Sequence, residues 1–350
     1  MIVGSDKVYA IENLYARYLA AEGAEVYQFA AQSLFYDFYQ RSLFNKLLFK
    51  AGLSSILKMI DKQFRQQVIA FRPDIIWVFK GMEILPTTLK WIRAQSIFLA
   101  NYNPDNPFLF TGSGSGNKNV TDSIALYDLH FTYNLEIKER LEREFKAPTC
   151  FLPFGFDLSM ELYETCRSEE ELNKVCFLGN PDNNRMAVLK ALLDKGVLID
   201  VYGHHWDKFI RHSNLTSYGV VYDEEFWKVL HRYRVQLNLM RVHNEQSHNM
   251  RTFEIPAVGA IQLAQDTPEH RIFFEPGREI FLFRDTDECF DKIKSLLELP
   301  PAQALEIRLR AREKSLSAGY SYKDRANTVF NIFKKLPFAT LKEMSVNAQI

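Results

Sequence analysis

Short apolar runs alternate with helix-length segments along the chain, and this alternation constrains the fold more than any other feature. In the first half the runs are "MIVG" (1–4), "AEVYQF" (24–29), "DIIWVF" (74–79), "SIFLAN" (96–101) and "DLHFTYN" (128–134). Each has the length of a buried strand, and helical or loop segments separate them. Such alternation favours a parallel sheet with helices on both faces, so we predict an α/β fold.

The pattern restarts after the segment 147–157. A strand "KVCFLGN" ends at Gly179, a helix follows, and the strands "VLIDVYG" (197–203) and "VQLNLM" (235–240) come next. A chain of 350 residues is also too long for one ordinary core. We therefore predict two Rossmann-like domains, residues 1–155 and 156–335, facing across a cleft. A tail at 336–350 could pack on the first domain, and the last helix, 322–335, could cross back onto it.

The charge balance limits the possible partners. Lys plus Arg and Asp plus Glu both total 43, so no global field attracts nucleic acid. No apolar run approaches the roughly 20 residues of a spanning helix. The four cysteines show no paired spacing, and the first ten residues do not read as a secretory signal. We expect a cytoplasmic protein that is soluble, or peripheral at the inner face of the membrane.

The stretch "HNMRTFEIPAVGAIQL" (248–263) places Glu254 among apolar residues. Pro256 is tolerated only in the first turn of a helix, which predicts a helix start near Thr252. That start follows a strand, and phosphate groups bind at helix N-termini at the carboxyl edge of such sheets. Arg251 and Asn249 would hold the phosphates and Glu254 would accept ribose hydroxyls. Alternatively, Glu254 only stabilises the helix N-terminus, by about 0.3–1 kcal/mol.

Three strings of the second half, "NMRTFEIPAVG" (249–259), "FFEPGREIFLF" (273–283) and "DTDECFDKIKSLL" (285–297), resemble CgeB-like glycosyltransferases of the GT-B fold. "FLGNPDNNR" (177–185), "VYGHHW" (201–206) and "LPFGFD" (152–157) add to the resemblance, which covers roughly 147–330. It implies a transferase with a glycosyl transferases group 1 type C-terminal domain. The C-terminal lobe would hold the sugar nucleotide and the N-terminal lobe the acceptor.

The resemblance also implies roles for individual residues. Glu254 matches the glutamate that binds the donor ribose in retaining relatives, and Arg185 and Arg251 would neutralise the diphosphate. Gly179 would also lie at the donor. The relatives carry a second glutamate eight positions before the first, where this chain has Gln246.

Two residues are candidates for catalysis. Asp105, in "NYNPDNP" (101–107), could remove the proton of the acceptor hydroxyl, although an Asp beside prolines also suits a simple turn. His204 could act as a base or contact the sugar, although it also suits a surface loop. Asp285 and Asp287, in "DTD" (285–287), could form a metal-binding Asp-x-Asp pattern, but Asp285 with Glu288 fits a helix capping box better. We therefore expect no metal and no cofactor.

The aromatic and basic segment 33–60 has two readings. Its helices could lay an apolar, basic-edged face on a membrane that carries lipid-linked acceptors, or they could pack on the N-terminal domain. The sequence as a whole predicts a metal-independent hexosyltransferase. It would move sugar from a nucleotide diphosphate donor to a saccharide or lipid-linked acceptor, and the resemblance implies a role in surface polysaccharide synthesis. The alternatives are a nucleotide-sugar epimerase and a non-catalytic binding or coat protein.

Overall fold

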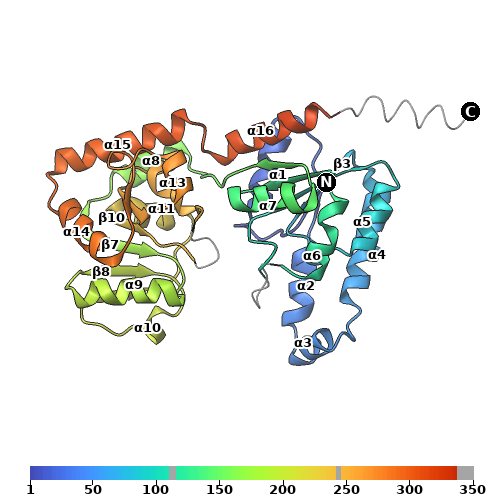
Figure 1. Ribbon diagram of the computed structural model, residues 1–350, viewed down its shortest axis with the longest axis horizontal. Coiled ribbons are helices and arrows are strands. Elements are labelled where there is room, and N and C mark those ends of the chain that lie inside the picture. Colours follow the sequence, from blue (N-terminus) through green and yellow to red (C-terminus); the bar gives the residue numbers. More distant parts are fainter. Residues whose placement is uncertain (110–115, 242–245, 337–350) are drawn as a thin grey trace, which may run out of the picture. The chain divides into compact units, whose positions relative to one another are not determined.

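The computed structural model describes residues 1–109, 116–241 and 246–336, and these form two compact units (Figure 1). Unit 2 spans Phe154–Ser321, and unit 1 comprises Met1–Pro153 together with the segment that begins at Tyr322. Apart from Leu336, the tail predicted at 336–350 lies outside the described residues.

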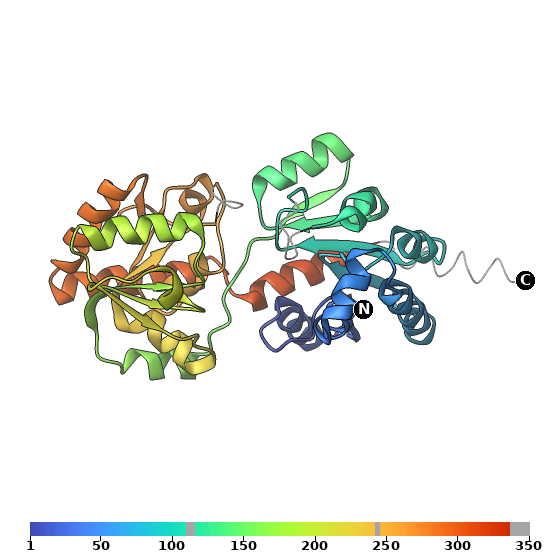
Figure 2. The same cartoon turned by 90° about the horizontal axis from the view of Figure 1, so that it is seen from below.

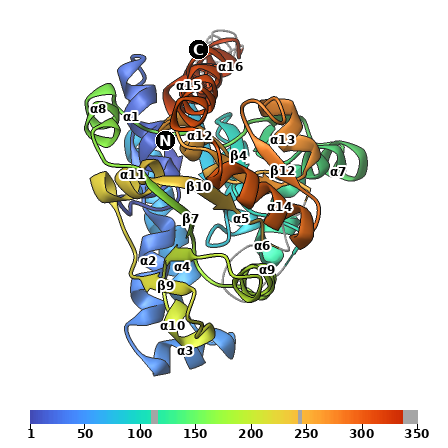
Figure 3. The same ribbon diagram turned by 90° about the vertical axis from the view of Figure 1, so that its left-hand side faces the viewer.

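Unit 1 is a parallel six-stranded sheet with helices. Its strands are β1 (Ile2–Val3), β2 (Gln28–Phe29), β3 (Ile75–Phe79), β4 (Phe98–Asn103), β5 (Leu129–Thr132) and β6 (Thr149–Phe151), in the order β2-β1-β3-β4-β5-β6. Its helical segments are α1 (Ile11–Ala21), α2 (Ala31–Gln40), α3 (Leu43–Lys50), α4 (Ile56–Phe71), α5 (Pro86–Arg93), α6 (Lys118–Ser123), η1 (Ile124–Leu126), α7 (Leu135–Phe145) and α16 (Tyr322–Lys334). Figures 1 and 3 show α3 between α2 and α4, at one end of this unit.

Unit 2 is a second parallel six-stranded sheet. Its strands are β7 (Leu172–Leu178), β8 (Ile199–Tyr202), β9 (Leu215–Tyr218), β10 (Tyr233–Asn238), β11 (Gln262–Gln265) and β12 (Phe281–Phe283), in the order β12-β11-β10-β7-β8-β9. Its helices are α8 (Met160–Arg167), α9 (Asn183–Asp194), α10 (Trp206–Phe209), α11 (Asp223–Arg232), α12 (Arg251–Ala257), α13 (Pro268–Phe273), α14 (Thr286–Leu297) and α15 (Pro301–Ser317). This is the doubly wound strand order of a Rossmann fold, so the predicted fold class is confirmed.

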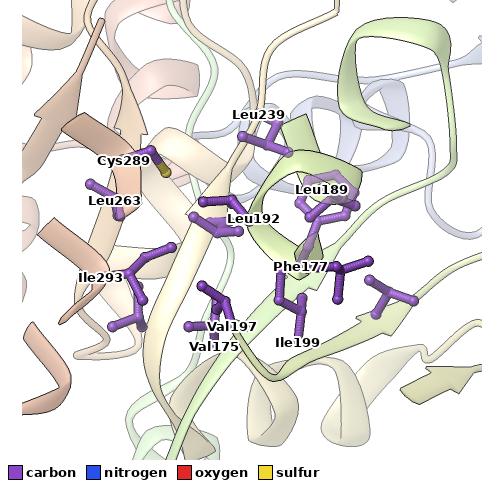
Figure 4. Packing of buried hydrophobic residues seen from close by; sticks show 14 of the residues in the cluster. Val175, Phe177, Leu189, Leu192, Val197, Ile199, Leu239, Leu263, Cys289 and Ile293 are labelled. Carbon is purple, nitrogen blue, oxygen red and sulfur yellow. The ribbon is translucent and has the colours of Figure 1, made fainter. Parts of the chain in front are cut away.

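Alternation along the strands of unit 2 creates two cores. Val175 and Phe177 of β7 face a cluster that also takes in Leu189 and Leu192 of α9 (Figure 4). Cys176, between them in sequence, points to the other face, where α11 packs. Figure 2 shows the sheet with α9 on one face and α8 and α11 on the other. Strands covered on both faces must be apolar throughout, which is why the sequence reads as continuous apolar runs.

Helix α16 belongs to unit 1, whereas the predicted boundary at 335 placed it in the second domain. The helix packs on α1, and the ring of Tyr322 lies 5.8 Å from that of Tyr15. Further along, the ring of Phe333 lies 5.8 Å from that of Trp77 and 5.9 Å from that of Phe131. Through these aromatic contacts, a helix near the C-terminal end of the chain completes the core around the sheet of unit 1. The last helix therefore crosses back onto the first unit, as the sequence analysis allowed.

No helix among the described residues is long and apolar enough to cross a membrane.

We predict that Phe333→Ala destabilises unit 1 by about 3 kcal/mol, because the change leaves a cavity beside Trp77 and Phe131. Urea unfolding followed by tryptophan fluorescence measures the loss. The exposed neighbour Asn331→Ala serves as the control and should change the free energy of unfolding by less than about 0.5 kcal/mol. Equal effects of the two substitutions would contradict this account of α16.

Candidate functional site

The strand order of unit 2 reverses between β7 and β10. From β7 the chain moves outward to β8 and β9, and it then returns to the other side of β7 through β10. The loops that follow these two strands therefore diverge and leave a crevice at the carboxyl edge, where ligands bind in open α/β sheets. Gly179 follows β7, and Asn249, Arg251 and Glu254 follow β10. The structure thus brings the predicted donor residues to one topological switch point.

Arg185 joins the two sides of this switch point. It is buried near the start of α9, and its Nε and Nη2 both donate to the carbonyl of Leu239, at 3.1 and 2.9 Å. Its Nη1 donates to the carbonyl of Asn180 at 3.0 Å. Burial is the main cause that lowers the pKa of Arg185 to about 10, with Asp182 opposing it. The guanidinium therefore stays charged at neutral pH, but most of its hydrogen bonds position the protein's own loops.

Gly179 and Gly203 let the loops after β7 and β8 approach each other. The Gly179 carbonyl accepts a 2.8 Å hydrogen bond from Nε1 of Trp206. Gly203 has a φ of +152°, and a Cβ there would lie 2.4 Å from the Gly179 oxygen. His204 is exposed, and its backbone N–H donates to Oδ1 of Asn180 at 3.0 Å. Glycine is therefore required at Gly203, and His204 stands at the solvent side of the same edge.

Asn249 caps the segment that leads into α12. Its Oδ1 accepts from the N–H of Thr252, whose Oγ1 accepts from the N–H of Asn249, both at 3.2 Å. Its Nδ2 donates to Oδ1 of Asn238 at 2.7 Å and contacts Sδ of Met240 at 3.2 Å. The side-chain groups of Asn249 thus make hydrogen bonds within the loop itself, and its role as a phosphate ligand stays a prediction.

Fewer backbone amides at the start of α12 are available to a ligand than the sequence indicated. The helix begins at Arg251, close to the predicted start, but Pro256 lies inside it and not in its first turn, so that part of the prediction was wrong. The amides of Thr252, Phe253 and Glu254 already donate to the carbonyls of Asn249 and Met250, at 3.0–3.1 Å. Within this segment, only the amides of Met250 and Arg251 carry no hydrogen bond. A ligand here would depend on side chains more than on the helix N-terminus.

Arg251 and Glu254 form an ion pair one turn apart on α12. Nη1 of Arg251 meets Oε2 of Glu254, and the guanidinium also lies over the ring of Phe226, 4.5 Å from its centroid. Glu254 is only 7% exposed, because Phe253 and Ile255 on either side are fully buried. The acid in the apolar stretch is thus balanced by a cation that retains 25% exposure of its side chain. The pair places one donor-rich and one acceptor-rich group side by side at the crevice.

A buried histidine and glutamate anchor the loop before α12. His248 Nδ1 lies 2.5 Å from Oε2 of Glu269, which also accepts from Ser247 at 2.7 Å. The other ring nitrogen, Nε2, accepts from the backbone N–H of Phe154 at 3.2 Å. The sequence did not indicate this cluster, because its members come together only through tertiary contact. It fixes the entry of the chain into unit 2 against the loop that carries the candidate site.

Asp285 caps α14, as predicted, since its side chain accepts from the N–H of Glu288 at 2.9 Å. Glu288 in turn accepts from the N–H of Arg284 at 2.9 Å. Across the described ranges, no group of three or more His, Cys, Asp or Glu side chains has the arrangement of a metal site.

Unit 1 has a switch point of its own, between β1 and β3. The segments after these strands carry two buried acids, Glu12 and Glu83, which are 6% and 5% exposed. Burial is the largest influence on both groups: it raises the pKa of Glu12 and brings that of Glu83 to about 7, while Lys80 acts in the opposite direction. Nζ of Lys80 lies 2.6 Å from Oδ2 of Asp105. The predicted base Asp105 is therefore part of an ion pair, and its partner Lys80 also acts on Glu83, an acid that sequence reasoning missed.

We predict that Glu83 makes the free energy of unfolding depend on pH. A pKa raised from 4.5 to about 7 means that the folded protein binds the proton more tightly than the unfolded chain does. The stabilisation is complete below pH 4.5 and is lost as pH rises through 7, with an upper limit of about 3 kcal/mol. Urea unfolding at pH 5 and pH 8 tests this. Glu83→Gln should flatten the wild-type decline, and parallel curves for the two proteins would contradict it.

Comparisons with known proteins agree with this geometry. Residues 185–331 match a "Glycosyl transferase-like" family model. The match begins at Arg185 and contains α12 with its ion pair. No curated protein matches the chain. The matched residues therefore include the β10 side of the switch point of unit 2, while β7 and Gly179 precede them.

Solved structures resemble the chain over nearly its full length. Sucrose-phosphate synthase from Thermosynechococcus elongatus has a TM-score of 0.68 and 12% identity, covering 97% of this chain and 99% of that chain. A UDP-forming α,α-trehalose-phosphate synthase from Burkholderia xenovorans has a TM-score of 0.64 and 11% identity, covering 95% and 98%. UDP-GlcNAc 2-epimerase from Neisseria meningitidis, bound to UDP-GlcNAc, has a TM-score of 0.58 and 12% identity, covering 96% and 99%. At such identity the likeness establishes the GT-B fold.

Proposed function

We propose that this protein is a glycosyltransferase that moves a sugar from a nucleotide diphosphate donor to a saccharide or lipid-linked acceptor. The observation that carries the proposal is the Arg251–Glu254 pair, which lies at the switch point of unit 2 inside the matched residues 185–331. A cation suits the diphosphate and a carboxylate suits the ribose hydroxyls. One nucleotide sugar would satisfy both groups of the pair.

In this proposal unit 2 stabilises the leaving group. As the sugar departs, negative charge grows on the diphosphate, and a fixed cation that meets this charge lowers the barrier. Arg251 supplies the charge, and the amides of Met250 and Arg251 add two donors. Arg185 keeps the loops of Asn180 and Leu239 in place and adds a positive field. Gly179 lets the donor approach the backbone closely, and His204 is at the same edge to contact the sugar.

Unit 1 would activate the acceptor. Its switch point holds Lys80 with Asp105, and near them the buried acids Glu12 and Glu83. A general base works best when its pKa lies near the working pH, and Glu83 meets this condition with a pKa of about 7. Asp105 stays a candidate base, but Lys80 occupies one of its oxygens. We therefore assign proton removal to Glu83, with Lys80 and Asp105 orienting the hydroxyl.

Several finer features belong to the same proposal. By the resemblance of its second half to CgeB-like enzymes, the protein would act as a hexosyltransferase in surface polysaccharide synthesis. The metal-independent mechanism follows from an arginine that neutralises the diphosphate, and transfer should accordingly survive EDTA. An epimerase of the same fold is the second candidate, supported by the likeness to UDP-GlcNAc 2-epimerase. An epimerase would act on the donor with no acceptor present, whereas a non-catalytic binding or coat protein would bind nucleotide without turnover.

We predict that Arg251→Ala or Glu254→Ala weakens the binding of UDP, GDP or dTDP by about 10- to 100-fold, the loss typical of a charge-assisted hydrogen bond. Isothermal titration calorimetry with the three free nucleotides measures this and also identifies the preferred base.

Arg278→Ala is a matched control for these variants. Arg278 pairs with Glu275 at the same three-residue separation in the same unit, but both side chains are more than half exposed. Its nucleotide affinity should equal that of the wild type. If Arg251→Ala and Arg278→Ala bind nucleotide equally well, the donor site is not on α12.

We predict that Glu83→Gln reduces the rate of transfer by 100-fold or more at pH 8, because the acceptor loses its base. In the wild type, kcat/KM should rise through pH 7 as Glu83 loses its proton. The rate measured against pH, with a sugar donor chosen from the calorimetry, tests this assignment. A Glu83→Gln enzyme that keeps the wild-type profile would return the role to Asp105.

A further inference from the structure

Helix α3 turns its apolar face away from the protein. Leu43, Phe44 and Leu47 lie on one side of the helix and are 77%, 66% and 65% exposed. Leu53, in the turn that follows, is 75% exposed. In an ordinary surface helix the apolar stripe faces the core and the polar residues face water. Helix α3 departs from this pattern, because it carries apolar side chains on its outward side as well as on its inward side, and none of its residues is fully buried.

The opposite side of α3 holds the helix in this orientation. Phe49 packs edge-on against Phe35 of α2, with ring centroids 4.8 Å apart, and against Tyr39, at 5.8 Å. Asn45 donates to the carbonyl of Phe38 at 2.7 Å. At the helix start, Ser42 caps α3 by accepting from the N–H of Asn45 at 3.0 Å. The outward face is therefore presented by a formed and capped helix.

The charges around this face have one sign. Between Tyr39 and Ile60 the chain contains Arg41, Lys46, Lys50 and Lys58 and no acidic residue. Lys50 follows Leu47 by one turn and is exposed at the border of the apolar face, while Lys46 lies over the ring of Tyr39. The face is therefore apolar at its centre and basic at its border, although the whole chain has no net charge. This combination is complementary to a surface that is negatively charged outside and apolar below.

We propose that the α3 face, defined as Leu43, Phe44, Leu47 and Leu53 with its basic border, docks on the surface of an anionic lipid bilayer. The side chains enter the boundary between headgroups and acyl chains, and the lysines meet lipid phosphates. A helix of eight residues lies along such a surface and does not cross it. The inference uses no residue of the proposed reaction, so it stands or fails independently of transfer.

Vesicle co-sedimentation tests the proposal with the full chain. The wild type should bind vesicles of phosphatidylglycerol and phosphatidylcholine at least 10-fold more tightly than vesicles of phosphatidylcholine alone. Raising the salt from about 0.1 to 0.5 M should weaken this binding, because it screens the attraction between lysines and phosphates.

The decisive variant is Leu43→Ser with Leu47→Ser, which should reduce the partition coefficient at least 10-fold. Its matched control is Leu305→Ser with Leu309→Ser, two exposed leucines at the same four-residue separation on α15. The control should bind vesicles like the wild type. A second variant, Lys50→Glu, should weaken binding to the anionic vesicles and leave the weak binding to neutral ones unchanged. Circular dichroism and urea unfolding of the same variants check that they are folded without relying on nucleotide binding.

Three results would overturn the proposal. The first is equal vesicle binding by the wild type and the Leu43/Leu47 variant, and the second is equal loss in the Leu305/Leu309 control. The third is a wild type that does not bind vesicles but self-associates in analytical ultracentrifugation, with the association lost in the Leu43/Leu47 variant. That outcome would assign the α3 face to a second copy of the chain.

Discussion

The buried guanidinium of Arg185 holds the carboxyl ends of β7 and β10 in a fixed relation, and the candidate site depends on that relation. Parallel strands leave their last carbonyls pointing to one edge, and at a switch point the following loops diverge. A single planar group with five donors can bridge the resulting gap by bonding carbonyls on both sides. Here it joins Asn180, after β7, to Leu239, after β10. The cost of burying the charge is offset by these hydrogen bonds and by the nearby Asp182.

The two units repeat one architecture but differ in the charge at their switch points. Unit 2 has an arginine that balances the acid Glu254 on the same helix. Unit 1 has two buried acids near a lysine that is itself paired with Asp105. The first arrangement suits an anion, because the cation keeps a quarter of its side chain exposed. The second keeps a carboxyl group protonated close to neutral pH. Two parallel six-stranded sheets of different strand order therefore present different charged groups at their switch points.

The fold was largely readable from the sequence, because strands buried on both faces must be apolar and the helices between them need one apolar stripe. The place of the residues proposed to bind the donor was also readable, since α12 follows a strand at the carboxyl edge of the sheet. Three features were not. Asn249 looked available to a ligand, but it caps the loop. Glu83 lies in a segment without periodicity, and only the tertiary structure shows that it is buried. Helix α16 has an ordinary amphipathic pattern, which does not say which core it completes.

His270 determines which group donates and which accepts in the hydrogen bonds on the buried side of α12. Its Nδ1 lies 2.8 Å from the carbonyl of Gln265 and must donate, so Nε2 accepts from the Thr252 hydroxyl at 3.0 Å. Burial lowers the pKa of His270 from 6.5 to about 4. The unfolded chain therefore binds this proton more tightly than the folded protein does, and the free energy of unfolding falls as pH drops from 6.5 to 4. Once protonated, Nε2 would donate, and the Thr252 hydroxyl would have to rotate away. Acid would then loosen α12 from its buried side, while its solvent-facing groups were still intact.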